Sequence, residues 1–218
     1  MARARRSQRT QEERSTETRR KLVDAAIGVS QESGYANLTI TKVAQYAGLS
    51  NGAMQHHFAT RDDLVLAMLD ALYPILDIPF AEITSRKLSV KDRVSTFVDL
   101  LWQIYSRPEY LVVWDIAFGT RSDPHLRAKL QAYQRDIAAR ALKHLAASFA
   151  DLNLTAEGSE QIFQLIISCL RGMALQTVFG VERRRADLEQ VKEITCERLV
   201  NSAKINKRAG LRASGSSE

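Results

Sequence analysis

Apolar residues recur at three- and four-residue spacing along most of this chain, which is the periodicity of amphipathic helices. The first such stripe consists of Leu22, Ala25, Ala26 and Val29. We expect its helix to begin near Ser15 or Thr16, either of which can cap the free amides. We expect it to end at Gly34, because glycine readily adopts the left-handed conformation that terminates a helix.

The segment LTITKVAQYAGLSNGAMQHHF predicts two short helices joined by a tight turn. Thr39 is the expected N-cap of the first, and Gly48 ends it because such a turn often requires a positive φ. Ser50 is the expected N-cap of the second, which covers residues 51–57. With small Ala44 at the crossing, the pair forms a helix-turn-helix pattern.

Longer helices are predicted in the rest of the chain. A fourth helix opens at Asp62 and runs to about Tyr73, where Pro74 stops or kinks it. Beyond Pro79 the apolar-periodic segments become longer. Capping residues or prolines at the expected starts predict five further helices. These cover about residues 89–106, 108–118, 123–149, 155–179 and 184–205.

The composition fits this helical interpretation. The 218 residues include 45% apolar residues, enough for a substantial core, and only 4 prolines and 10 glycines. We therefore predict an all-α protein with about nine helices, in which a three-helix helix-turn-helix domain precedes a larger helical domain. The predicted divisions are a disordered basic arm (1–14), the helix-turn-helix domain (15–61), the larger domain (62–206) and a frayed tail (207–218).

Positive charge is concentrated at the N-terminal end. Residues 1–61 carry ten Lys or Arg against five Asp or Glu, whereas the remainder carries 21 against 20. This asymmetry predicts a polyanion partner, with nucleic acid the commoner one, although charge alone leaves an anionic membrane surface open. The basic arm fits a role in tracking DNA and a solvated tail equally well.

Other classes of protein have little support. No apolar run approaches the roughly 18–20 residues that span a bilayer, and no apolar region follows the N-terminal arginines as in a secretory signal. Cys169 and Cys196 are expected to be buried, reduced thiols of a cytoplasmic protein. His56 and His57 point about 100° apart on a helix and have no partner for a metal. We expect no enzyme, no metal and no cofactor.

The residues of the helix-turn-helix segment resemble the TetR family of bacterial regulators. The resemblance rests on TITKVAQYAGLS at 39–50, NGAMQHHF at 51–58 and RDDL at 61–64, and it extends over about residues 16–73. It implies a cytoplasmic homodimer that binds a near-palindromic operator in double-stranded DNA and responds to a small-molecule effector. One departure is Gln55, because the family usually has tyrosine there and often also at His57.

The amides at the start of the first short helix, with the hydroxyls of Thr39 and Thr41, predict a phosphate site at a positive dipole end. Asn51 and Gln55 are expected to contact base edges, since the amide of Gln55 can pair with adenine. The full predicted set of DNA-binding residues is Thr39, Thr41, Lys42, Ser50, Asn51, Gly52, Ala53, Gln55, His56, His57 and Arg61. Lys42, His57 and Arg61 are assigned to phosphate, and His56 faces either DNA or solvent. Core positions in the same segment are Val43, Leu49, Met54 and Phe58.

The larger domain supplies two further predictions. By the resemblance it encloses a pocket for an apolar or aromatic effector, with polar anchors such as Asp115 and Arg121, although aromatic residues here are more often core. The candidate effector residues are Trp102, Tyr105, Trp114, Asp115, Phe118 and Tyr133. A broad apolar stripe predicts either a dimer interface or a purely internal core, and its candidate interface residues are Ile162, Ile166, Leu170, Met173, Val191 and Ile194.

Taken together, these features predict a sequence-specific repressor that its effector releases from the operator. A non-specific architectural DNA-binding protein is less favoured, because its positive charge would be spread over the whole molecule. A helical protein-interaction module without DNA binding leaves the polar face of the second short helix unexplained.

Overall fold

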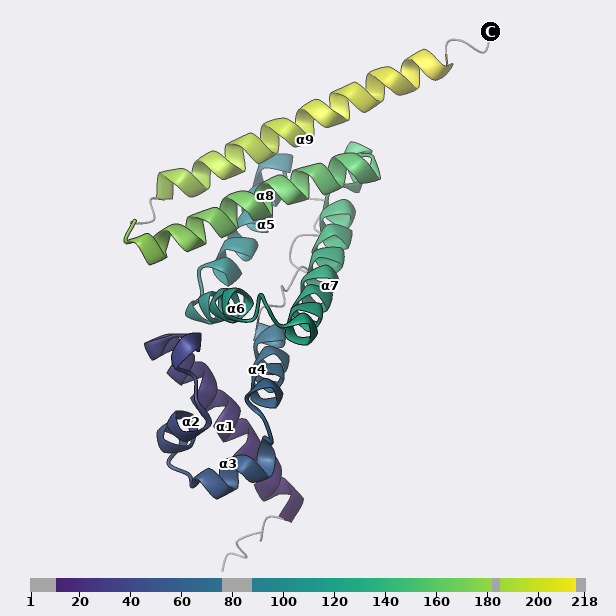
Figure 1. Cartoon of the computed structure of the whole chain (residues 1–218). Helices are drawn as coiled ribbons and strands as arrows, with labels where there is room; N and C mark the ends of the chain where they lie inside the picture. The colour runs from purple at the N-terminus through teal and green to yellow at the C-terminus, as the bar shows by residue number, and fades with distance from the viewer. Residues whose placement is uncertain (1–10, 76–87, 182–184, 215–218) are drawn as a thin grey trace, which may run out of the picture. The chain divides into compact units, whose positions relative to one another are not determined.

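The computed structural model describes residues 11–75, 88–181 and 185–214, with the backbone only for residues 75 and 207–214. In these ranges all regular structure is helical, as predicted, and no strand occurs. The α-helices are labelled in Figure 1 and cover Gln11–Ser33 (α1), Ile40–Ala47 (α2), Asn51–His57 (α3), Arg61–Ile75 (α4), Val90–Tyr105 (α5), Pro108–Gly119 (α6), Pro124–Ser148 (α7), Ala156–Gln176 (α8) and Arg185–Ser214 (α9). Short 3₁₀ turns cover Tyr35–Asn37 (η1), Ala150–Leu152 (η3) and Thr177–Phe179 (η4).

The chain divides into two compact units that do not follow the boundary predicted at residue 62. The first unit contains residues 1–75 and 111–131, and the second contains residues 76–110 and 132–218. Helix α4, most of α6 and the start of α7 therefore group with the helix-turn-helix segment. Sequence periodicity did not predict this, because it identifies buried faces without identifying what covers them.

Most helix starts are where their capping residues predict them. The hydroxyl oxygens of Thr39, Ser50, Ser89 and Thr155 each accept a backbone N–H three residues on, at 3.0–3.2 Å. At α4, Thr60 and Asp63 cap each other: the Asp63 carboxylate accepts the Thr60 N–H at 3.0 Å, and the Thr60 hydroxyl accepts the Asp63 N–H at 3.1 Å. Such caps satisfy amide donors that a helix leaves open.

Two helices are longer than predicted. Helix α1 begins at Gln11, so the part of the predicted arm that the structure describes is helical. Its first turns are polar on all sides, and apolar periodicity cannot reveal a helix of that kind. Helix α9 continues to Ser214, so residues 207–214 are helical rather than a frayed tail. Gly34 does end α1 with a positive φ of 79°, but its ψ of 158° lies outside the left-handed helical region.

In the first unit, α1 packs against α2 and α4, and α2 packs against α3. The stripe predicted on α1 is buried, and Val43, Met54 and Phe58 from the next two helices complete the interior. Leu49 is half-buried, so it belongs to the edge of this core. The buried faces leave the outer sides of α2 and α3 in solvent.

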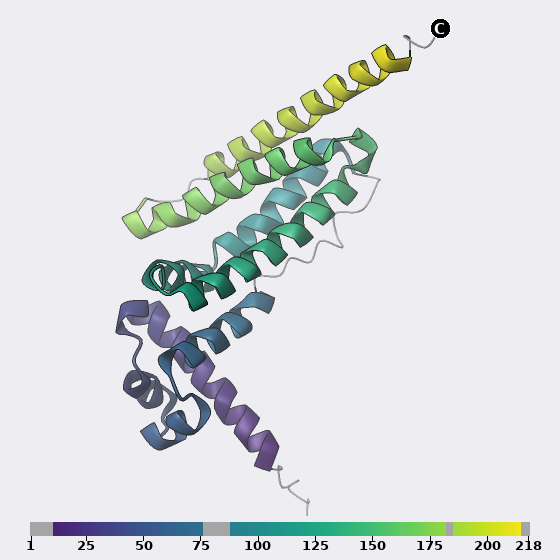
Figure 2. The ribbon, with the colours of Figure 1, turned by 45° about the vertical axis from the view of Figure 1, so that its right-hand side comes forward.

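In the second unit, α8 and α9 run side by side in opposite directions, and α5 packs against both (Figures 1 and 2). Arg93 is buried here, and its charge is paired with a carboxylate. Its guanidinium donates to both carboxylate oxygens of Asp151 at 2.7 and 2.8 Å, and to the Ser148 carbonyl at 2.8 Å. This pair joins α5 to the end of α7 and the η3 turn.

The segment Ala156–Phe179 is long and apolar enough to cross a membrane by length and composition alone. Its apolar residues Ile162, Ile166 and Leu170 are 5%, 0% and 0% exposed inside the second unit. A core helix passes the same test of length and composition, and the burial of these residues identifies this one as a core helix.

Candidate nucleic-acid interface

The α2–turn–α3 segment has the geometry of a helix-turn-helix. Gly48 adopts the left-handed conformation (φ 64°, ψ 37°), and its N–H is bonded back to the last turn of α2. The Leu49 N–H donates to the Ala44 carbonyl at 2.9 Å, which closes the turn. Ser50 then caps α3, so both ends of the turn are fixed by residues within it.

The outer side of α3 is polar and open to solvent. Asn51, Gln55 and His56 are exposed, whereas Met54 on the opposite side is 0% exposed. At the start of α2, Thr39, Thr41 and Lys42 are also exposed. Ser50 and Gly52 are exposed, and Ala53 and His57 are half-buried. The two short helices thus present one polar surface, which we call the recognition face.

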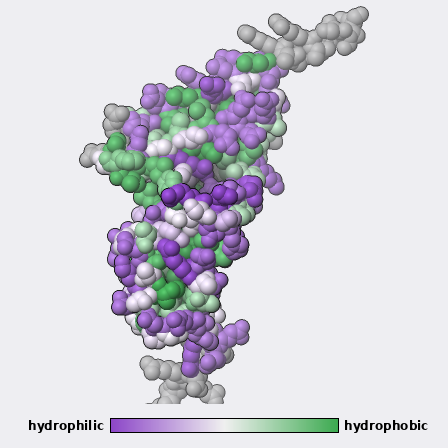
Figure 3. All heavy atoms as spheres, in the orientation of Figure 1, coloured by the Kyte–Doolittle hydropathy of each residue, from purple (hydrophilic) through white to green (hydrophobic). Residues whose placement is uncertain are grey.

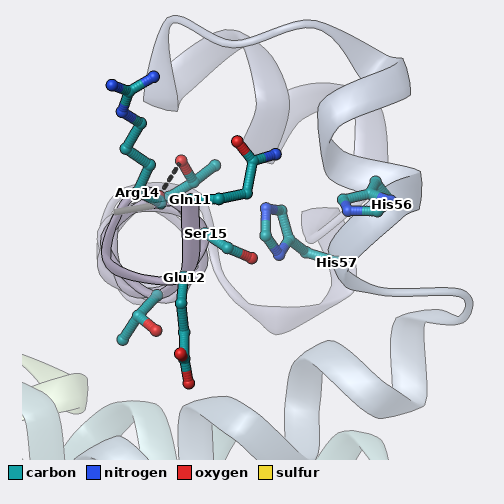
Figure 4. Close-up of a pocket in the computed structure, with 8 residues that line it drawn as sticks. Gln11, Glu12, Arg14, Ser15, His56 and His57 are labelled. Carbon is teal, nitrogen blue, oxygen red and sulfur yellow. Dashed lines mark hydrogen bonds between the residues drawn. The ribbon is translucent and has the colours of Figure 1, made fainter. Parts of the chain in front are cut away.

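The start of α1 borders the recognition face and was missed by the sequence reasoning. Its first turns and the end of α3 enclose an open hollow, and its lining residues include Gln11, Arg14, Ser15, His56 and His57. In Figure 4 the side chains of Gln11 and Ser15 project from α1 toward His57, while Glu12 points to another side of the helix. These residues reach the recognition face because α1 begins as early as Gln11. That start could not be predicted, because the first turns of α1 carry no apolar stripe.

The two histidines at the end of α3 lie at the edge of this hollow. Their rings meet edge to face with centroids 5.2 Å apart. Burial lowers the pKa of His57 below its usual value, and the nearby His56 and Arg19 lower it further. His57 is therefore neutral at pH 7, and an adjacent phosphate would favour its protonation.

Arg61, predicted to contact phosphate, is engaged inside the first unit instead. Its guanidinium donates to the Tyr35 carbonyl at 2.7 Å and lies 4.1 Å from the centre of the Tyr35 ring. Tyr35 is 4% exposed. Arg61 therefore holds the η1 turn, which leads directly into α2, and a direct role on DNA is not supported.

Asp115, predicted to anchor an effector, also contacts Tyr35. Its carboxylate accepts a short hydrogen bond from the Tyr35 N–H. One turn along α6, Gly119 lies so close to the Tyr35 ring that any added Cβ would overlap it. Asp115, Gly119 and Arg61 thus converge on one residue, and we call this group the Tyr35 junction. Arg121, the other predicted anchor, donates to the Phe118 carbonyl at 2.8 Å.

The remaining candidate effector residues do not form one group within either unit. Trp114 and Phe118 belong to the first unit, where their rings stack with centroids 5.4 Å apart and Phe118 is 54% exposed. Trp102, Tyr105 and Tyr133 belong to the second unit. Within that unit Tyr105 is 6% exposed and meets Tyr110 edge to face at 4.7 Å.

The predicted interface residues divide into two sets. Ile162, Ile166 and Leu170 are buried by the chain's own helices and cannot also meet a second copy. The others lie outside this core: Met173 and Val191 are half-buried, and Ile194 is 44% exposed. Together they line a groove between α8 and α9 that also includes Cys169 and Val181.

The groove continues into an exposed apolar patch at the end of α8. Val178, Phe179 and Val181 are 65%, 82% and 49% exposed. In Figure 3 hydrophobic atoms gather on this side of the second unit. We call the groove and the patch together the α8–α9 face.

No group of three or more potential metal ligands occurs among the residues that the structure describes. His125 and His144, which are isolated in the sequence, are not part of any such group within those ranges. Cys169 and Cys196 are free thiols, but both are half-buried and not buried as predicted, and Cys169 lines the groove between α8 and α9.

Comparison with known proteins agrees with this geometry. A family described as "Bacterial regulatory proteins, tetR family" matches residues 22–68. The HTH-type transcriptional regulator CymR of Pseudomonas putida is 31% identical over 196 residues, covering 87% of this chain and 92% of that protein.

Solved structures share the fold. A putative TetR-family transcriptional regulator from Mesorhizobium loti is 17% identical with a TM-score of 0.66, over 86% of this chain and 97% of that one. The multidrug binding protein EbrR complexed with malachite green is 22% identical with a TM-score of 0.55, over 83% and 96% of the two chains. Both likenesses extend through the two units.

Proposed function

Because this chain belongs to the TetR family of DNA-binding transcriptional regulators, we propose that it is a cytoplasmic, homodimeric repressor that a small-molecule effector releases from a near-palindromic operator. The observation that carries the proposal is the recognition face, which is polar and solvent-exposed on a capped helix-turn-helix. A helix that reads DNA must present side chains able to bond to base edges.

In this proposal, the recognition face docks in the major groove. Asn51 and Gln55 contact base edges, Gly52 permits close approach, and Ala53 meets a thymine methyl. Phosphate contacts come from the start of α2, with the hydroxyls of Thr39 and Thr41 and the ammonium of Lys42, and from Ser50 and His57. Gln11 and Ser15 of α1 join them, because they border the same hollow as His57. Arg61 is left out, since Tyr35 occupies its guanidinium.

Dimerisation is assigned to the α8–α9 face. Exposed apolar groups of this size favour burial against another apolar surface. A second copy related by a two-fold axis would place two recognition helices roughly 34–36 Å apart, in successive major grooves. This explains why the operator is expected to be a near-palindrome.

The interface is tested by charge insertion at its exposed position. Ile194→Glu should convert dimers into monomers on a calibrated sizing column with light scattering, and operator affinity should fall with it. Leu88→Glu is the matched control, because Leu88 is 38% exposed and lies outside this face. Dimers of Ile194→Glu as stable as those of the control would remove the α8–α9 face from the proposal.

Effector control is supported by the likeness to EbrR, a protein that binds malachite green, and by the Tyr35 junction. Asp115 and Gly119 link α6 to the turn before α2, so a displacement of α6 would reach the recognition face. Coupling of this kind is typically about 1–3 kcal/mol, or 5–150-fold in operator affinity.

Selection of bound DNA from random oligonucleotides tests the central claim. We expect a near-palindromic motif with two half-sites about one helical turn apart. A featureless but DNA-bound pool would indicate an architectural binder, and no bound DNA would indicate an interaction module. A fluorescence screen with Trp102 and Trp114, followed by operator titration, then tests whether any bound compound releases the DNA.

A further inference from the structure

A second arginine of the second unit, the half-buried Arg171, differs from Arg93 in the charge of its partners. Arg171 lies on α8 and interacts with residues of α5, α6 and α7. Its guanidinium donates to the side-chain oxygen of Gln134 at 2.7 Å and lies 5.5 Å from the centre of the Tyr105 ring. It also interacts electrostatically with Tyr110. All these neighbours are neutral.

No carboxylate among the described residues pairs with Arg171. Two acidic groups of the same unit pair with other cations, Asp151 with Arg93 and Asp99 with Lys192 at 2.8 Å. Burial raises the pKa of Tyr105, so its hydroxyl stays protonated and supplies no compensating negative charge. The guanidinium is thus a shielded positive charge without a counter-ion in the part of the chain that the structure describes.

The guanidinium also has an unused donor. The Nε atom of Arg171 is shielded from solvent and has no hydrogen-bond partner. The Nε atom of Arg93 is in the same state, but Asp151 neutralises the charge of Arg93. A shielded, unsatisfied N–H is uncommon in proteins, and the open donor on a buried guanidinium suits an anion. The fork of an arginine matches the two oxygens of a carboxylate better than any other common anion except phosphate.

The aromatic surroundings narrow the class of anion. Tyr105 and Tyr110 are 6% and 3% exposed, and their rings stand edge to face beside the guanidinium. Such surfaces favour an apolar or aromatic body over the strongly hydrated phosphate group. We propose that Arg171 is the anchor for an effector that carries a carboxylate on an aromatic or apolar body, held between α5, α7 and α8. This inference rests on the proposed effector control and names its ligand class.

Matched pairs of probes test the charge directly. Benzoate and phenylacetate carry the carboxylate, and benzamide and phenylacetamide replace it with a neutral group of the same shape. Calorimetric titration of the full-length protein should show each acid binding at least tenfold more tightly than its amide. Equal affinity within a pair, or no binding of either acid, would overturn the proposal.

Two variants test whether the preference for acids over amides depends on Arg171. Arg171→Met removes the charge and should abolish the preference for the acid. Gln134→Glu places a carboxylate on the guanidinium from within the chain, at the position of the present 2.7 Å bond. Gln134→Glu should lower the affinity for the acids at least tenfold. It should also raise the midpoint of thermal unfolding, because it neutralises the charge of Arg171 with little change of shape. Arg107→Gln, an exposed arginine of the same unit, is the control and should behave as the wild type.

The readouts separate the site from the proposed function. A preference for the acids that survives in both Arg171→Met and Gln134→Glu would refute Arg171 as the anchor. If Arg171→Met does not fold, the result for Gln134→Glu alone decides the question. Operator release is measured independently with each bound acid. Acids that bind through Arg171 but never release DNA would leave the site standing and refute effector control. Release of DNA by a neutral compound alone would refute the carboxylate anchor and leave effector control standing.

Discussion

Gly119→Ala should destabilise the protein, although a glycine-to-alanine change at a helical position with negative φ normally does the opposite. Gly119 is the last residue of α6 and has an ordinary negative φ, so alanine meets no backbone strain. Alanine in a helix is favoured over glycine by up to about 1 kcal/mol. The opposing term is the Tyr35 ring, which the new methyl group would overlap.

The structure sets the size of that opposing term. If the ring moves outward, its burial is lost, which costs about 2–3 kcal/mol for a large apolar side chain, together with its contact with the Arg61 guanidinium. If α6 moves away instead, the hydrogen bond from the Tyr35 N–H to Asp115 is broken. A bond to a charged group contributes about 1.5–3 kcal/mol. Either route, less the helix term, leaves a net loss of about 1–2 kcal/mol.

Urea unfolding measures this loss. In a Trp102→Phe background the fluorescence comes from Trp114, which lies in α6 within the first unit. Gly52→Ala is the control, because its added Cβ would meet only the Ser50 hydroxyl, at 3.8 Å. In a Tyr35→Leu background the Gly119→Ala change should cost much less, giving a coupling energy of about 1–2 kcal/mol between the two sites. A Gly119→Ala protein as stable as the wild type, or more stable, would refute the packing argument.

Three further predictions concern DNA. Gln55→Ala should relax sequence preference at one or two base pairs at a cost of about 1–3 kcal/mol, and equal losses on specific and random DNA would contradict base reading. Lys42→Met should weaken binding to all sequences and reduce the slope of log affinity against log salt by about 1; an unchanged slope would remove Lys42 from the phosphate contacts. Operator affinity should rise as the pH falls below 7, because phosphate favours the protonated His57 whose pKa in the free protein is lowered; the rise should level off below that pKa, and His57→Asn should flatten it.

The local features of the helix-turn-helix could be predicted because the chemistry lies within a few residues. Thr39, Ser50 and Thr155 cap their own helices, and a side chain that bonds three residues ahead needs no tertiary information. Gly48 was predictable for the same reason, since a turn between two helices demands a positive φ. Val43, Met54 and Phe58 were recognisable as core from their spacing.

The failures have a common physical cause, which is dependence on distant parts of the chain. Arg61 looks like a phosphate ligand until the fold brings Tyr35, 26 positions away, against its guanidinium. Leu170 carries the right periodicity for an interface, but periodicity does not say which helix covers a side chain. The sequence does not single out Arg171, because the lack of a carboxylate partner among the described residues becomes visible only when four helices are assembled.

The Tyr35 junction explains how one helix could influence DNA binding without touching DNA. Tyr35 opens the turn that leads into α2. Asp115 holds its N–H, Arg61 holds its carbonyl and lies over its ring, and Gly119 packs against the ring. Asp115 and Gly119 lie one turn apart on α6, so any shift of that helix changes the N–H bond and the ring contact together. A bound effector need therefore supply only the free energy of these two contacts to alter the start of α2. Under the proposed control, Asp115→Asn should weaken the operator complex and tighten effector binding. In either protein, the factor by which effector weakens operator binding should equal the factor by which operator weakens effector binding, because coupling between two binding sites is reciprocal.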